Sequence, residues 1–259
     1  MPFQIFKKVD DIIVDNPAWL GRTELLIGTE ALSRLRKTNV LLIGLGGVGS
    51  FAGEFLVRSG IGKITIVDGD TVDPTNKNRQ LQALDSTVGQ PKANLLKARY
   101  LDINPQLIIQ SFDHFLEPQD IDQLLTSEPF DFVLDCIDSV LPKITLLSTA
   151  RKHKVKIYSS MGAGGKMDPS KIRVADLYQT KECKFAQQVR KQLKRIDKRK
   201  GIIAIYSEEI QPKAALKYTD GSKYKKSYYG TISYMPALFG LTMASEVIRK
   251  VVGAGEIVE

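Results

Sequence analysis

One stretch, residues 40–49, limits most strongly what this chain can fold into. Residues 40–43 are four apolar residues in a row, the pattern of a strand buried on both faces. Gly44, Gly46 and Gly49 complete the pattern G-x-G-x-x-G, and residues 50–57 have a helical pattern. A strand, a glycine turn and a helix in this order bring backbone N–H groups and a helix N-terminus to a phosphate. We therefore predict a nucleotide site here; a tight turn without a ligand is the alternative.

A second predicted strand, residues 63–68, ends in an acid. Asp68 follows the last glycine by about twenty residues, the spacing at which a carboxylate holds a ribose hydroxyl pair. The alternative is an acid that only ends a strand at the surface. Further strands alternate with helices along residues 90–160, which predicts an α/β fold with a doubly wound, mostly parallel sheet.

The polar residues after these strands bear on which nucleotide would bind. NAD carries two phosphates that backbone amides can largely satisfy. Attack at the α-phosphate of ATP builds up negative charge and requires fixed cations and Mg²⁺. Arg79 and Lys92 supply cations at the predicted mouth of the sheet, Asn76 offers a hydrogen bond to a phosphate, and Asp138 a ligand for Mg²⁺. This set favours ATP over NAD(P).

Four motifs as a set resemble the ubiquitin-activating-enzyme-like family that includes ThiF, MoeB and HesA. They are GLGGVGS, DGDTVDPTNKNRQ, VGQPK and DCIDS, at matching spacing. Members of this family adenylate a carboxylate with ATP. The resemblance implies that phosphate and ribose contacts come from the following residues: Gly44, Gly46, Gly47, Gly49, Asp68, Asp70, Asn76, Arg79, Lys92, Asp138 and Ser139. Of these, Lys92 would lie at the α-phosphate and Asp138 would bind the Mg²⁺.

The resemblance also concerns the N-terminal arm. It implies that Arg22, in LGRTELLIG, reaches into the ATP site of a second subunit, which would make the enzyme a homodimer with a catalytic arginine supplied in trans. The alternative is a solvated arm residue. We expect one domain, with an arm at 1–28, an ATP-binding half at 29–165 and a substrate and dimer half at 166–259.

The second half bears on the substrate. The family's activators of small carrier proteins usually hold zinc in paired C-x-x-C motifs, and this chain has two cysteines in total and no such motif. The segments SSMGAGGKMDPSKIRVADLYQTK and IDSVLPK instead resemble the family's dehydratase branch, which acts on tRNA. That branch adenylates the carboxylate of threonylcarbamoyladenosine and closes it to a cyclic form with loss of AMP.

The charge pattern agrees with an RNA partner. The chain has a net charge of +8. A basic helix is predicted from Lys184 to Lys200, with Ala186, Val189, Leu193 and Ile196 on one apolar face. A second basic run, from Lys213 to Lys226, contains Tyr218 and Tyr224, which offer stacking faces for bases. The alternative is a solvated helix with one packed side.

The cysteines and histidines give weaker signals. The segment KKSYYGTISYMP before the last predicted helix lacks the cysteine that members of the dehydratase branch can carry. Cys183, between Lys181 and Lys184, is a minor candidate nucleophile, and an ordinary surface or half-buried thiol is the alternative. Cys136 is expected to pack in a strand, and we assign no role to His114 and His153.

Other readings stay open. An activator of a ubiquitin-like or sulfur-carrier protein would have the same fold, and a sulfur-transfer protein is a further candidate partner. An NAD(P)-dependent oxidoreductase would give Arg79 and Lys92 no shared purpose, and a nucleotide-sensing dimer would bind ATP without turnover. Two unpaired cysteines and the lack of a signal-peptide pattern predict a cytoplasmic protein. The uncharged stretch 227–245 is expected to be a buried core helix and not a membrane span.

Overall fold

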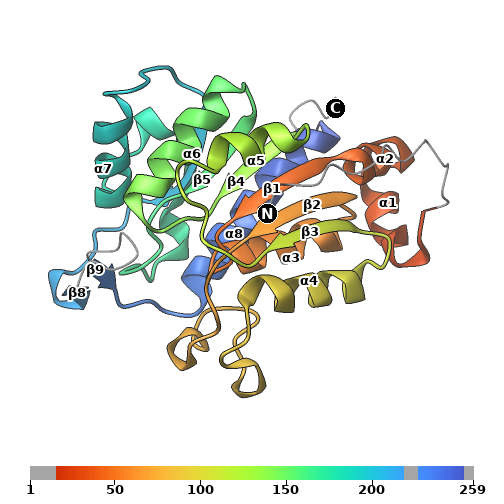
Figure 1. The fold of residues 1–259 in the computed structure, drawn as a ribbon, viewed down its shortest axis with the longest axis horizontal. Coiled ribbons are helices and arrows are strands. Elements are labelled where there is room, and N and C mark those ends of the chain that lie inside the picture. Colours follow the sequence, from red (N-terminus) through yellow and green to blue (C-terminus); the bar gives the residue numbers. More distant parts are fainter. Residues whose placement is uncertain (1–15, 219–226, 254–259) are drawn as a thin grey trace.

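A seven-stranded sheet forms the centre of the molecule (Figure 1). The computed structural model describes residues 16–218 and 227–253. The strand order is β3-β2-β1-β4-β5-β7-β6, and all neighbours are parallel except the β6–β7 pair at one edge. The strands are β1 (Asn39–Ile43), β2 (Lys63–Val67), β3 (Ile108–Phe112), β4 (Phe132–Asp135), β5 (Lys156–Ser160), β6 (Ile172–Asp176) and β7 (Ile202–Ser207). The predicted doubly wound, mostly parallel sheet is confirmed.

Helices cover both faces of this sheet. They are α1 (Gly21–Ile27), α2 (Thr29–Lys37), α3 (Gly49–Arg58), α4 (Lys92–Ile103), α5 (Ile121–Ser127), α6 (Val140–Lys152), α7 (Lys184–Leu193) and α8 (Tyr234–Val252). A small hairpin, β8 (Leu216–Tyr218) with β9 (Ser227–Tyr229), lies apart from the sheet. Figure 1 shows α3 and α4 on the side of the sheet opposite to α5 and α6.

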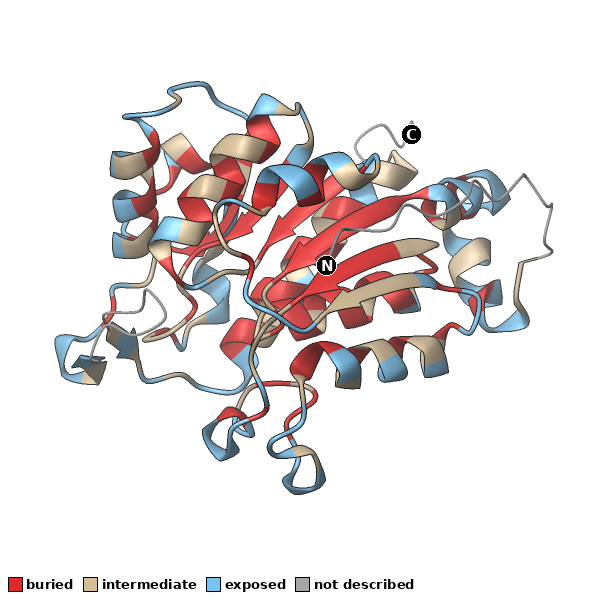
Figure 2. Cartoon of the chain, viewed as in Figure 1, coloured by how far each residue is buried: buried red, intermediate tan, exposed pale blue. Residues whose placement is uncertain are grey.

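The alternation of side chains along β1 divides the core into two clusters. Val40 and Leu42 pack with residues of α3, α4 and α8, while Leu41 and Ile43 pack with residues of α5, α6 and α7. All five residues of β1 are buried, and Figure 2 shows the neighbouring strands buried as well. A strand between two helical layers has no solvent side, which explains its unbroken apolar run.

The basic helix is shorter than predicted from the sequence. It ends at Leu193 and not at Lys200, and Ile196 is 64% exposed instead of packed. Contacts to other elements turn the chain away after Leu193: Arg151 of α6 pairs with Asp197 at 3.2 Å, and the Tyr178 hydroxyl donates to the Asp197 carbonyl at 2.7 Å. The helical periodicity of residues 184–200 cannot predict these contacts, because they involve residues far away in the sequence.

The stretch 227–245 is also divided differently from the prediction. It begins as strand β9, and the helix starts at Tyr234. The buried side of α8 includes Met235, Phe239 and Met243, so the prediction of a core helix holds from Tyr234 onward. Within the described residues, no helix combines the length and the apolar composition that crossing a membrane would require.

Helix α8 approaches α3 closely because it has a glycine at the contact. A Cβ atom on Gly240 would lie 2.3 Å from the Val48 carbonyl oxygen and 2.9 Å from the Ala52 nitrogen. Both atoms belong to backbone, so a side chain here would push the two helices apart.

We predict that Gly240→Ala lowers the free energy of unfolding by about 1–3 kcal/mol, the usual cost of overpacking. Denaturant unfolding measures the change. Gly21→Ala is the control, because a Cβ there meets no atom within 4 Å and its φ is −55°; that variant should match or exceed the wild type. Equal stability of the two variants would contradict the packing argument.

Candidate active site

In the glycine turn between β1 and α3, close contacts leave no room for a side chain at three of the four glycines. Gly44 has φ +88°, and a Cβ there would lie 2.8 Å from the Cys136 carbonyl oxygen. A Cβ on Gly49 would lie 1.8 Å from the Gly44 carbonyl oxygen, and one on Gly47 would lie 2.9 Å from Pro236 Cβ. At Gly46, by contrast, the nearest atom would be Gln80 Nε2 at 3.8 Å. Packing therefore explains Gly44, Gly47 and Gly49, while Gly46 faces space that a ligand can use.

Asp68 ties the end of β2 to this turn. Its carboxylate accepts hydrogen bonds from the Leu45 N–H at 2.6 Å and from the Asp70 N–H at 2.8 Å. Gln82 donates to the Leu45 carbonyl at 2.8 Å, so both backbone groups of Leu45 are held. Burial raises the pKa of Asp68, and the nearby Lys92 partly opposes this rise. A carboxylate has about four lone-pair sites, so Asp68 keeps capacity for further donors.

Lys92 and Asp70 form an ion pair beside Asp68. The Lys92 side chain is 5% exposed, its Nζ lies 3.1 Å from Asp70 Oδ2, and its backbone N–H donates to the Asp70 carbonyl at 3.0 Å. Lys92 is the first residue of α4. The ammonium group has three donors, and the bond to Asp70 fixes its position.

Arg79 lies against the glycine turn from the other side. Its carbonyl oxygen is 3.1 Å from where a Gly47 Cβ would be, and its Nη1 donates to the Thr75 carbonyl at 3.0 Å and to Asn78 Oδ1 at 2.8 Å. Burial lowers the pKa of Arg79, and the charges of Asp138 and Asp73 oppose this change. Asp138 thus lies within electrostatic reach of Arg79.

Asn76 and Ser139 lie in the loops that follow β2 and β4, the two strands that flank β1. Asn76 is buried at the end of a 3-10 turn (Pro74–Asn76), where its Oδ1 accepts from the Asp73 N–H at 3.3 Å. Ser139 is the buried N-cap residue of α6, and Asp138 before it is exposed. Both loops follow the carboxyl ends of strands, where ligands of open α/β sheets bind.

A buried ion pair, not assigned any role from the sequence, supports this edge of the sheet. Asp135 ends β4 and Lys143 lies in the first turns of α6; both side chains are fully buried and 2.5 Å apart. Ser159 also donates to the Asp135 carboxylate at 2.6 Å, and Lys143 donates to the Ser160 carbonyl at 3.0 Å. The Ile137 N–H donates to Asp135 at 3.1 Å. In the sequence, the pattern that could have indicated this ion pair is an acid at the end of an apolar strand followed by a lysine within an apolar helix.

Arg22 does not belong to this group within one chain. It is exposed on α1, next to Leu20, whose side chain lies 2.9 Å from where a Gly60 Cβ would be. Gly60 precedes β2 and Asp68 follows it, and a five-residue strand is about 16 Å long. Arg22 therefore lies at the amino edge of the sheet and the glycine turn at the carboxyl edge.

The structure describes part of the two basic runs for which we predict RNA contact. The residues of α7 alternate between a buried face, Ala186, Val189 and Leu193, and exposed lysines that include Lys184 and Lys191. In the second basic run, Tyr218 is 77% exposed at the end of β8. Tyr224 and the residues around it, 219–226, lie outside the described residues.

Neither cysteine has the surroundings of an exposed nucleophile. Cys183 is 4% exposed and packs in the cluster under α6 and α7, so the expectation of a surface or half-buried thiol is wrong. Cys183 lies within electrostatic reach of the buried Lys166, and burial lowers the pKa of that lysine. Cys136 packs with its sulfur 3.7 Å from Met243 Sδ, and burial raises the pKa of its thiol.

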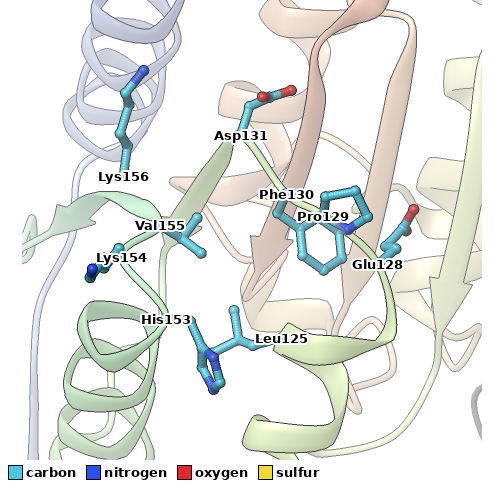
Figure 3. A pocket seen from close by; sticks show the side chains of 9 residues that line it. All are labelled: Leu125, Glu128, Pro129, Phe130, Asp131, His153, Lys154, Val155 and Lys156. Atoms are coloured by element: carbon cyan, nitrogen blue, oxygen red, sulfur yellow. The ribbon is translucent and has the colours of Figure 1, made fainter.

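The hollow shown in Figure 3 lies at the other edge of the sheet. It has a volume of about 410 Å³ and is bordered by the starts of β4 and β5, with Phe130, Lys156 and His153 among its lining residues. His153 Nε2 is already 2.9 Å from Asp122. This hollow is far from the glycine turn and does not form part of the candidate site.

Comparison with known proteins places the chain among adenylating enzymes. The model of the ThiF family matches residues 20–259. A tRNA threonylcarbamoyladenosine dehydratase of Bacillus subtilis is 39% identical over 235 residues, which cover 88% of this chain and 92% of the relative. The dehydratase of Escherichia coli is 35% identical over 258 residues, 92% of this chain and 96% of the relative.

Solved structures agree over most of the chain. The crystal structure of the E. coli dehydratase TcdA in complex with ATP has a TM-score of 0.84 at 34% identity and covers 94% of this chain and 98% of that one. By contrast, the molybdopterin-synthase adenylyltransferase of E. coli is 36% identical over 141 residues, 54% of each chain.

The buried pair yields a stability prediction. Lys143→Met leaves the Asp135 carboxylate buried without its cation and should lower the free energy of unfolding by about 3–5 kcal/mol. The double variant Asp135→Leu with Lys143→Met removes both charges and should recover at least half of that loss. Denaturant unfolding of both variants and of Asp135→Leu completes a double-mutant cycle. Additive losses in the double variant would show that the two charges do not depend on each other.

Proposed function

This chain belongs to the ThiF family, and from that premise we propose that it is an ATP-dependent tRNA threonylcarbamoyladenosine dehydratase. The observation that carries the proposal is the placement of the cations: Arg79 lies against the glycine turn within electrostatic reach of Asp138, and Lys92 lies beside Asp68, which binds the turn. The fold matches an ATP-bound dehydratase over 94% of the chain. Likeness to the adenylyltransferase covers 54% of the chain, which favours the dehydratase over activation of a ubiquitin-like or sulfur-carrier protein.

The first step of the proposed reaction is adenylation. A carboxylate oxygen of the threonylcarbamoyl group attacks the α-phosphorus of ATP, and pyrophosphate leaves. Lys92, oriented by Asp70, and Arg79, held by Thr75 and Asn78, stabilise the charge that develops on the phosphates. We propose that the ribose hydroxyls donate hydrogen bonds to the remaining lone pairs of Asp68. The Asn76 amide would donate a hydrogen bond to a phosphate oxygen.

The second step is ring closure. An atom of the neighbouring carbamoyl group attacks the activated carbonyl and loses its proton, and AMP leaves with the former carboxylate oxygen. The nucleoside thereby loses the elements of one water. Because both groups belong to the same side chain, proximity lowers the barrier by several kcal/mol, and no enzyme nucleophile is required. The burial of Cys183 and the raised pKa of the Cys136 thiol agree with this step.

Mg²⁺ is the metal that we propose for the site. Mg²⁺ bound to nucleotides uses one or two carboxylates together with phosphates and waters. The exposed carboxylate of Asp138 fits this donor set, with Ser139 beside it. In residues 16–218 and 227–253 no three His, Cys, Asp or Glu side chains gather as an all-protein site would need. When bound, Mg²⁺ would neutralise negative charge on the phosphates, and Asp138 would hold the metal ion in position.

A second copy of the chain is the partner that we propose for α1. Leu25 and Leu26 are 89% and 84% exposed on this helix, beside Arg22. Neighbouring exposed leucines mark a surface that a partner covers. A homodimer would cover them and carry Arg22 to the carboxyl edge of the other subunit's sheet.

For the substrate, tRNA would contact the exposed lysines of α7 and the β8–β9 hairpin. We also propose a cytoplasmic location, in keeping with the two free thiols.

A sulfur-transfer protein as a partner of this chain stays a prediction.

The reaction itself gives the first test. Incubation with ATP, Mg²⁺ and threonylcarbamoyl-modified tRNA should produce a nucleoside lighter by one water, detected by mass analysis after digestion. Lys92→Ala should slow the reaction by about 10²–10³-fold, because it removes a cation from the transition state. Lys97→Ala, on the same helix, is the matched control and should keep the wild-type rate. Formation of AMP on a carrier peptide, with no change in the nucleoside, would favour the alternative activity.

Mixing experiments test the arginine in trans. Arg22→Ala and Lys92→Ala should each retain little of the wild-type activity alone. Random mixing makes half of the dimers mixed, each with one intact site, so about a quarter of the wild-type activity should return. A mixture of Lys92→Ala with Asp138→Ala is the control and should regain nothing, since both residues come from the same chain. Failure of the first mixture, with dimers exchanged, would exclude Arg22 as a shared residue.

A further inference from the structure

Residues 230–236, which join β9 to α8 and include the first residues of α8, connect the hairpin to the glycine turn. At its start, the Gly230 N–H donates to the Ala215 carbonyl at 2.9 Å, and the Gly230 carbonyl accepts from the Gly165 N–H at 2.8 Å. At its end, Pro236 Cβ lies 2.9 Å from where a Gly47 Cβ would be. This connecting segment therefore contacts both the proposed RNA surface and the proposed phosphate site.

Asn78 joins the connecting segment to Arg79. Its Nδ2 donates to the Thr231 carbonyl at 2.9 Å, and its Oδ1 accepts from Arg79 Nη1 at 2.8 Å. A side-chain amide has a donor at one end and an acceptor at the other, so it can satisfy a carbonyl and a guanidinium together. The two partners also fix which end of the amide is which.

Resting on the proposed function, we propose that Asn78 is a positioning residue that couples RNA contact at the β8–β9 hairpin to the Arg79 guanidinium at the phosphates of ATP. The path consists of three hydrogen bonds in sequence: Ala215 to Gly230, Thr231 to Asn78, and Asn78 to Arg79. A shift of the hairpin moves the Thr231 carbonyl, and the amide transmits the shift to the guanidinium.

The coupling has a thermodynamic consequence. If RNA improves the position of Arg79, tRNA tightens the binding of ATP, and ATP tightens the binding of tRNA by the same factor. Such factors are typically about fivefold or more. The enzyme would in this way favour adenylation when the tRNA is in place.

The test measures the Kd of a non-hydrolysable ATP analogue with Mg²⁺, in the absence and in the presence of saturating tRNA. In the wild type, tRNA should lower this Kd by about fivefold or more. In Asn78→Ala the effect of tRNA should disappear. Asn78 is exposed, so the variant is expected to fold, and its thermal unfolding should match that of the wild type.

Asn78→Asp separates the two bonds of the amide. It keeps an acceptor for Arg79 and removes the donor to Thr231, so the effect of tRNA should again be lost. Its carboxylate also competes with the phosphates for Arg79, so the analogue alone should bind more weakly than in Asn78→Ala. A merely structural role of Asn78 would not give this order.

Asn94→Ala is the matched control. Asn94 is an exposed asparagine on α4 whose side chain donates to Asp113 at 3.3 Å. It should retain the wild-type effect of tRNA. A wild-type protein without the effect, or an Asn78→Ala variant that keeps it, would overturn the proposal. Coupling that depends on Asn78, without dehydration of modified tRNA, would instead reject the proposed reaction and leave the coupling in place.

Discussion

The ion pair between Asp135 and Lys143 is the interaction on which the carboxyl edge of the sheet depends. It joins the end of β4 to the first turns of α6 and, through Ser159 and Ser160, to the end of β5. Two opposite charges that are fully buried are favourable only with good geometry and further hydrogen bonds, and here both are present. The loop between Asp135 and Lys143 carries Asp138 and Ser139. The ion pair therefore fixes both ends of this loop and with them the backbone positions of the two residues.

The same principle organises the charges at the glycine turn. Acids and cations alternate: Asp70 holds Lys92 beside Asp68, and Arg79 lies within reach of Asp73 and Asp138. Cations that are held in advance need little rearrangement when charge develops on a phosphate. Backbone contacts at Gly44, Gly47 and Gly49 keep these groups at a constant distance, because any Cβ there would displace neighbouring atoms.

Much of the fold and part of the site could be predicted from local patterns. The alternation of strands and helices, the positions of β1 and β2, and the glycine turn follow from apolar runs and glycine spacing. The end of α7, the edge strand β6 with its neighbour β7, and the buried state of Cys183 did not follow, since each depends on partners far along the chain. Asp197, for example, ends α7 through contacts with Arg151 and Tyr178.

The sequence by itself determined the class of fold and the residue types that a phosphate site needs, because hydrophobic period and glycine spacing act over a few residues. Only the tertiary structure decided which side chains meet: Lys92 with Asp70, Lys143 with Asp135, Asn78 with Thr231. The tertiary structure also placed Arg22 at the amino edge of the sheet, opposite to the carboxyl edge where the glycine turn lies. These pairings join residues 8 to 153 positions apart in the chain, and packing of the helices on the sheet, which no local pattern encodes, brings them together.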